Sequence, residues 1–244
     1  MQNISDYVIS ALVVLLTLTI HEYAHAYAAY KMGDPTARNL GRLTLNPIKH
    51  IDPVGAICMV FFHVGWAKPV PINARNFKNP RKGFAITALA GPGINIIISF
   101  IFAFFYLLFL SFISSVAFES EFLFNLSRNF LLFLYLMHVI NLGIAIFNLI
   151  PVPPLDGSRI LSLLLPPKYY FAIMRRERTI YFVLLGWLII GNVISEVLLS
   201  ISFIAASPIL SAIATLFSLS NILSYAIEGV SWLMISFWSL LPFI

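Results

Sequence analysis

One five-residue stretch near the N-terminus, His21-Glu22-Tyr23-Ala24-His25, has the residue types and spacing that a zinc site needs. On a helix, residues four apart lie on the same face, so His21 and His25 can offer two imidazole nitrogens to one metal ion. Glu22 can reach the open coordination position and accept a proton from an attacking water. The alternative is a chance HExxH motif with ordinary buried histidines. Each ionisable group in a membrane helix costs on the order of 2.5–3.5 kcal/mol, and a bound metal would compensate that cost.

A third ligand must come from elsewhere in the chain, because catalytic zinc sites usually have three protein ligands and a water. Asp156 is the best candidate, since it follows a proline-rich stretch that stops a helix and holds an extended turn. The spacing leaves a second interpretation open, in which Asp156 caps a short helix that starts near Ser158. The remaining histidines are the other candidates: His50, His63 and His138.

The composition indicates a protein whose solvent is the lipid bilayer. Of 244 residues, 60% are hydrophobic and 10% are charged, whereas soluble domains carry about 25% charged residues. The net charge of +5 does not predict a nucleic-acid partner, because Lys and Arg cluster in loops between Lys31 and Arg178, a pattern that sets membrane orientation. The single cysteine, Cys58, excludes an intrachain disulfide. We expect one integral membrane domain over residues 1–244, because no hydrophilic stretch is long enough to fold separately.

Apolar runs of helical length predict an all-α polytopic membrane protein. The first run, at about 7–31, contains the HExxH motif and has no Lys or Arg before it, so we expect no cleavable signal peptide. Residues 208–244 are apolar throughout, and Glu228-Gly229 is expected to divide them into two crossings. The total prediction is about five to six transmembrane helices, of which the others lie at about 84–112, 130–149 and 179–201.

The apolar segment 54–66 is too short to cross the membrane and is predicted to be re-entrant. Its β-branched and aromatic residues favour an extended conformation. The loops on either side, 34–52 and 67–82, are both basic, and a segment that enters and returns places both on the cytoplasmic side. With the N-terminus outside, the HExxH motif and the proline-rich turn then both approach the cytoplasmic face.

Three motifs together resemble the site-2 protease family of intramembrane zinc metalloproteases, especially its compact bacterial type. They are HExxH, Gly91-Pro-Gly-Ile-Asn95 and Asn148-Leu-Ile-Pro-Val-Pro-Pro-Leu-Asp156-Gly157. The stretches Gly33-Asp-Pro-Thr-Ala and Gly65-Trp-Ala-Lys-Pro-Val-Pro are also similar to the family. The resemblance covers a catalytic core of about residues 7–165, with C-terminal transmembrane helices at about 179–244 and no recognised PDZ or CBS domain.

The resemblance implies proteolysis of a transmembrane protein substrate within the bilayer, with one Zn²⁺ per chain. It assigns His21, His25 and Asp156 as zinc ligands and Glu22 as the general base.

Two asparagines and one segment also receive roles from this resemblance. It implies that Asn148 and Asn95 lie near the site as substrate-orienting or oxyanion-stabilising groups. It further implies that residues 54–73 form a membrane-embedded β-hairpin that presents the substrate as a strand. Helix packing is the alternative for Asn95, because Gly91 and Gly93 before it let backbones approach closely.

Two functions of other classes compete with proteolysis. A membrane metal transporter also places histidines and carboxylates in helices, but it needs no general base. A catalytically inactive membrane binding protein is the second alternative, and the intact Glu22 argues against it. We expect the protein in the bacterial cytoplasmic membrane with its active site toward the cytoplasm, and the sequence leaves homo-oligomer formation open.

Overall fold

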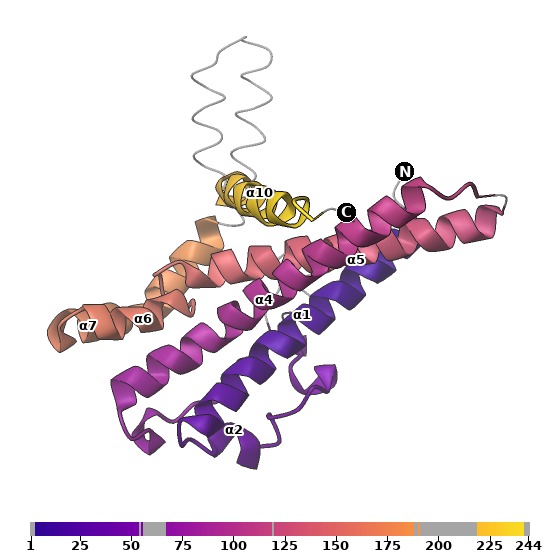
Figure 1. The fold of residues 1–244 in the computed structure, drawn as a ribbon. Helices are drawn as coiled ribbons and strands as arrows, with labels where there is room; N and C mark the ends of the chain where they lie inside the picture. The colour runs from indigo at the N-terminus through magenta and orange to yellow at the C-terminus, as the bar shows by residue number, and fades with distance from the viewer. Residues whose placement is uncertain are drawn as a thin grey trace, which may run out of the picture.

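The computed structural model describes residues 3–53, 55, 67–118, 120–187, 190 and 219–241. Within these ranges the chain is helical and forms no strand; its β-type pairing there is an isolated antiparallel bridge between Ile51 and Ala67. Three long helices, α1 (Ile4–Lys31), α4 (Pro80–Ser114) and α5 (Glu121–Leu149), pack side by side (Figure 1). All three are long and apolar enough to cross a membrane, in agreement with the predicted all-α class.

Local sequence signals set the ends of these helices. The N–H of Asn3 donates to the Asp6 carboxylate at 3.1 Å and starts α1. Gly33 ends it in the left-handed region, with a φ of 105°. The side chain of Asn79 accepts from the N–H of Lys82, and a proline occupies the first position of α4.

Small residues let α1 and α4 approach each other closely. Ala29 of α1 and Ala85 of α4 are fully buried, and Ala88 of α4 is nearly so. Small side chains at helix interfaces are typical of membrane bundles, where close packing replaces the hydrophobic driving force. A buried hydrogen bond also links α1 to α5: the side-chain amide of Asn141 donates to the hydroxyl of Thr17 at 2.9 Å.

Shorter elements connect the long helices at one end of the bundle. Between α1 and α4 lie α2 (Thr36–Asn39) and two 3-10 turns, η1 (Pro47–Lys49) and η2 (Ala74–Asn76). After α5 the chain turns through prolines into α6 (Gly157–Leu164) and α7 (Pro167–Met174). Residues 177–187 are again helical.

The helix bounds differ from the sequence predictions at two places. Helix α5 begins at Glu121, well before the predicted start near residue 130, and the acid in its first turn suits the helix dipole. Helix α10 (Leu219–Trp238) runs unbroken through Glu228 and Gly229, so the predicted division there is wrong. It packs on α4 and α5, where the indole N–H of Trp238 donates to the carbonyl oxygen of Phe100 at 2.9 Å.

Two predictions fall on residues that the structure does not describe. The segment 54–66, predicted to be re-entrant, lies outside the described residues except for Gly55. Of the helix predicted at 179–201, residues 188–189 and 191–201 also lie outside them. The count of five to six crossings therefore stays a prediction, and three candidate spans lie in the described part of the chain.

Candidate metal centre and active site

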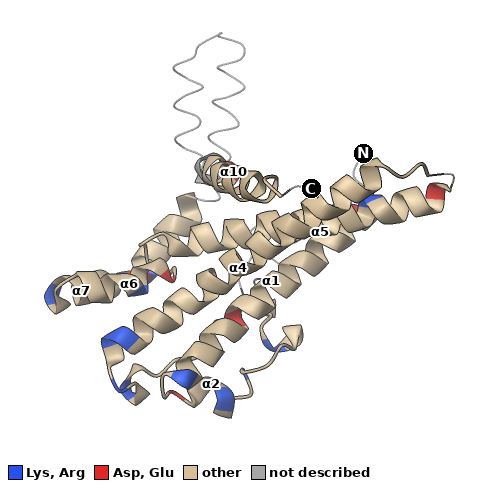
Figure 2. Ribbon diagram, viewed as in Figure 1, with Lys and Arg blue, Asp and Glu red and all other residues tan. Residues whose placement is uncertain are grey.

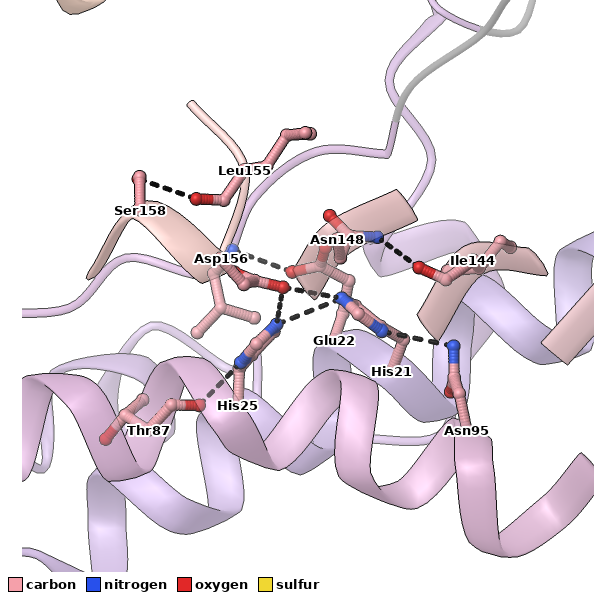
Figure 3. A network of polar contacts seen from close by, with 11 residues as sticks. His21, Glu22, His25, Thr87, Asn95, Ile144, Asn148, Leu155, Asp156 and Ser158 are labelled. Carbon is pink, nitrogen blue, oxygen red and sulfur yellow. Dashed lines mark hydrogen bonds and ion pairs between the residues drawn. The ribbon is translucent and has the colours of Figure 1, made fainter. Parts of the chain in front are cut away.

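His21 and His25 lie on the face of α1 that packs against α4, and both are buried. Their Nε2 atoms are 3.0 Å apart, and the rings meet edge to face (Figure 3). The four-residue helical spacing thus brings the two nitrogens together as the motif predicts.

The Asp156 carboxylate reaches both histidines from the other end of the sequence. Its Oδ2 lies 3.2 Å from Nε2 of His21 and 3.1 Å from Nε2 of His25. Asp156 also precedes the first residue of α6, but its side chain makes no capping hydrogen bond to that helix. The capping interpretation therefore finds no support, whereas the carboxylate lies where a third ligand would.

The turn that carries Asp156 depends on Gly157. A Cβ at position 157 would collide with the carbonyl oxygens of Leu149 and Ile150, the latter at 2.6 Å. The turn therefore packs directly on the end of α5, and only glycine fits there. This close return directs the carboxylate back toward α1.

The three ligand atoms fit a zinc ion in both type and position. They all lie within 4.8 Å of one another, and the pair distances of 3.0–3.2 Å are close to the edge of about 3.3 Å in a tetrahedral site with bonds of 2.0–2.1 Å. Two imidazoles and one carboxylate are also a donor set found in catalytic zinc sites.

Each histidine ring is held through its second nitrogen. Nδ1 of His25 lies 2.7 Å from the carbonyl oxygen of Thr87, and because a carbonyl only accepts, Nδ1 carries the proton and leaves Nε2 free for a metal. Nδ1 of His21 lies 3.2 Å from the side-chain amide of Asn95, which is fully buried. A metal-bound His21 also carries its proton on Nδ1, so the amide oxygen of Asn95 belongs at this position.

Gly91 of α4 lies directly against both rings. A Cβ on Gly91 would come within 2.6 Å of Cε1 of His25 and 2.7 Å of Cε1 of His21. By contrast, nothing lies within 4 Å of the corresponding position on Gly93. The first glycine of the GxxxN motif is therefore required by the site itself.

Glu22 lies beside the three converging atoms and faces the same cavity. Its Oε2 accepts a hydrogen bond of 2.9 Å from the backbone N–H of Val70. Val70 belongs to the extended segment 67–73, which also lines the cavity. The cavity measures about 870 Å³ and is bordered by the histidines, Glu22, Asp156 and Asn148. Asn148 uses its amide N–H group to donate to the carbonyl oxygen of Ile144 at 3.0 Å.

Two alternative third ligands lie outside this cluster. A ring nitrogen of His50 lies 2.8 Å from the carbonyl oxygen of Thr44, away from the other histidines. His138 is buried between helices, where its ring contacts the hydroxyls of Ser99 at 2.8 Å and Ser231 at 2.7 Å. His63 falls outside the described residues.

The charge state of Asp156 suits metal binding. Burial raises the pKa of Asp156, but hydrogen bonds and charge interactions with protonated His21 and His25 lower it below its usual range, and a bound cation would act in the same direction. The carboxylate is therefore ionised at neutral pH, the form that coordinates a cation.

Comparison with known proteins decides which family these features belong to. The model of peptidase family M50 matches residues 9–191. The chain belongs to this family. Peptidase family M50 is the site-2 protease family, so the resemblance inferred from the three motifs is confirmed.

Three curated relatives of this M50 peptidase carry the words zinc metalloprotease in their names. YwhC of Bacillus subtilis is 44% identical over 165 residues, which cover 68% of this chain and 72% of the relative. Rip2 of Mycolicibacterium smegmatis is 26% identical over 63% of this chain and 56% of its own length. MJ0392 of Methanocaldococcus jannaschii is 25% identical over 69% of this chain but only 38% of its own length. No solved structure matches the chain significantly.

Family and relatives together identify this M50 peptidase as a zinc metalloprotease, and its three long apolar helices agree with a membrane protein. The sequence motifs did not reveal the contacts made by backbone groups, namely the Thr87 carbonyl at His25 and the Val70 N–H at Glu22. Every residue carries a carbonyl group and every residue except proline an N–H, so only the position of Val70, inside a stretch already similar to the family, offered a signal.

Proposed function

We propose that this M50 peptidase cleaves peptide bonds within or beside transmembrane segments of other membrane proteins. One observation carries the proposal: the Nε2 atoms of His21 and His25 and Oδ2 of Asp156 converge beside Glu22 on a helix able to span a membrane. The two histidines lie ten and six residues before the end of α1 at Lys31. At 1.5 Å per residue they are roughly 15 and 9 Å from that end, a depth that supports a site within the hydrocarbon layer.

In the proposed mechanism His21, His25 and Asp156 hold one zinc ion and Glu22 is the general base. When bound, zinc polarises the scissile carbonyl and lowers the pKa of water. Glu22 accepts the proton of the attacking water and delivers it to the leaving amine. The Val70 N–H holds one Glu22 oxygen, and no other hydrogen bond to the Glu22 side chain is found among the described residues, so its second oxygen can make this transfer.

Substrate and water must both reach this buried position. The 870 Å³ cavity beside Glu22 gives water room to enter. A substrate helix must unwind locally, because its peptide groups are otherwise hydrogen-bonded within the helix.

The two asparagines receive different roles in this proposal. Asn148 lines the cavity next to Asp156 and is placed to orient the substrate. Asn95 is fully buried behind His21, so its contact favours a role in holding that ring rather than direct contact with substrate.

The proposed orientation places the basic end of the bundle in the cytoplasm. Lys and Arg gather around α2, the start of α4 and the α6–α7 region (Figure 2). Arg128 lies in the opposite half of the bundle, where it pairs with Asp6 at 3.0 Å. This asymmetry follows the positive-inside rule.

The proposed re-entrant hairpin is supported at its base. The antiparallel bridge joins Ile51 and Ala67, and the N–H of Lys68 donates to the carbonyl oxygen of His50 at 2.9 Å. The chain therefore returns to the place it left, as an in-and-out segment requires, and both basic loops then lie on one side. We also retain the crossing predicted at about 179–201 as part of the proposed multi-pass topology.

Membership in a peptidase family favours hydrolysis over the metal-transport alternative, which has no use for the base. The test is co-expression with a panel of single-span membrane proteins, comparing the wild type with Glu22→Gln. Glu121→Gln is the matched control, because it makes the same change in an exposed residue at the far end of the bundle. Cleavage by the wild type and the control but not by Glu22→Gln supports the proposal, whereas equal cleavage by all three contradicts it.

A further inference from the structure

We propose that Asp34 and Arg42 are positioning residues that clamp the extended segment 67–73 against Glu22. Both belong to the polar connection after α1, and among the described residues their hydrogen bonds go to groups other than His21, His25 and Asp156. The inference rests on the proposed function, because it concerns the placement of the proposed base. It adds two charged residues to the catalytic unit that the HExxH, GxxxN and proline motifs do not include.

The segment needs an external clamp because its own sequence limits its hydrogen bonding. Pro69 and Pro71 have no N–H group, so Val70 supplies the one backbone donor between Lys68 and Ile72. That donor is used at Glu22, at 2.9 Å. A segment with so few backbone N–H donors cannot be held in place by the hydrogen bonds of a β-sheet. Side chains from other parts of the protein must fix its two ends instead.

Asp34 holds the C-terminal end of the segment. Its side chain is fully buried, and Oδ2 accepts from the backbone N–H of Asn73 at 2.6 Å. Oδ1 accepts from the N–H and hydroxyl of Thr36 and from the amide of Asn76 at 2.7 Å. A carboxylate that is removed from water and saturated by hydrogen bonds is rigid and specifies one geometry.

Arg42 holds the N-terminal end. Its guanidinium is buried and donates to the carbonyl oxygen of Lys68. On the same residue the N–H donates to His50, so both polar backbone groups of Lys68 are fixed. A buried cation against a backbone carbonyl is expensive to break, because the charge would be left without a partner.

The two anchors therefore lie on either side of Val70. Lys68 is two residues before it and Asn73 three residues after it, so movement at either anchor shifts the N–H that meets Glu22. A displacement of about 1 Å in a catalytic group can reduce the rate on the order of 100-fold. The zinc ligands sit on other elements and keep their positions.

The test measures kcat and KM of the full-length, zinc-loaded enzyme on a substrate that the wild type cleaves and Glu22→Gln does not. Asp34→Asn and Arg42→Met each remove one anchor, and Arg42→Lys restores a donor. Arg38→Met is the matched control, because Arg38 is exposed and donates only to the Tyr30 hydroxyl, at 2.8 Å, among the described contacts. Zinc content and melting temperature are measured for every variant, and kcat is expressed per zinc-loaded molecule.

We expect kcat to fall about 10- to 100-fold in Asp34→Asn and Arg42→Met with zinc content unchanged, and Arg42→Lys to recover most of the rate. Wild-type kcat in both anchor variants would overturn the inference, as would loss of zinc in parallel with activity. If Asp34→Asn does not fold, Asn76→Ala removes one of the four donors and should lower kcat by a smaller factor; an unchanged kcat there also overturns it. A wild type that cleaves nothing beyond Glu22→Gln refutes the proposed function instead.

Discussion

Gly91→Ala places a methyl group between α4 and the two imidazoles of the candidate zinc site. The new Cβ would lie 2.6 Å from Cε1 of His25 and 2.7 Å from Cε1 of His21. To reach ordinary van der Waals contact at 3.4 Å, the His21 ring must retreat by roughly 0.7 Å and the His25 ring by roughly 1.0 Å, because Nε2 of His25 lies even closer to the new Cβ than Cε1 does. Metal sites tolerate ligand shifts of about 0.2 Å, so this displacement is large for the site.

The expected loss follows from the cost of overpacking, typically about 1–3 kcal/mol. If the ligands bear this strain, zinc affinity falls about 5- to 150-fold. Gly93→Ala is the matched control, because it lies two residues away in the same helix with nothing within 4 Å of its Cβ. The control should keep full zinc affinity and gain up to about 1 kcal/mol of helix stability.

The assay is competitive zinc titration against a chelator, with the melting temperature measured in parallel. Residue 91 precedes a proline, so alanine there also disfavours the helical backbone and lowers stability. That effect alone would leave the zinc affinity of the folded protein unchanged. Equal zinc affinity in Gly91→Ala and Gly93→Ala would therefore show that Gly91 does not position the two imidazoles for the metal.

Four further predictions concern the base, the third ligand, the topology and the buried acid. Glu22→Gln should abolish proteolysis but keep zinc bound, because Gln matches the size of Glu but accepts no proton; metal analysis beside a cleavage assay checks both. Asp156→Ala should remove most bound zinc, whereas a mere helix cap would cost only about 0.5–2 kcal/mol of stability and no zinc. Lys78→Cys in a Cys58→Ser background should resist an impermeant label added outside intact cells. Rapid labelling would show that the loop 67–82 lies outside the cell and that the proposed topology is wrong. Burial would raise the pKa of Asp34, but its hydrogen bonds hold the pKa below the ordinary 3.8. The stability of the wild type should therefore decrease as the pH is lowered beneath about 4, and that of Asp34→Asn should decrease less. Melting temperatures measured between about pH 5 and 3 check this.

The chemistry of the site was predictable where helix geometry determines it. The spacing of His21 and His25 permits one arrangement on a helix, and the structure shows it. Asp156 lies 131 residues beyond His25, and spacing alone left it between a ligand and a cap. The predicted topology favoured the ligand, because it has α5 end at the same face of the membrane as the HExxH half of α1.

Other features could not be predicted because they depend on backbone groups or on weak sequence signals at the ends of helices. The Thr87 carbonyl that orients His25 is common to all residue types, so no pattern marks it. The start of α5 was missed because polar residues near Arg128 resemble a loop. The division at Gly229 was wrong because a helix packed on two others tolerates an exposed glycine at a cost of about 1 kcal/mol.

The position of the cut in a substrate shows whether the enzyme acts within the membrane. Purified zinc-loaded enzyme and its Glu22→Gln variant would be reconstituted in liposomes with a single-span substrate, and the new termini mapped by mass spectrometry. We predict new termini inside or next to the substrate's transmembrane segment with the wild type and none with Glu22→Gln. Cuts confined to distant soluble parts of the substrate, or the same cuts with both enzymes, would contradict this prediction.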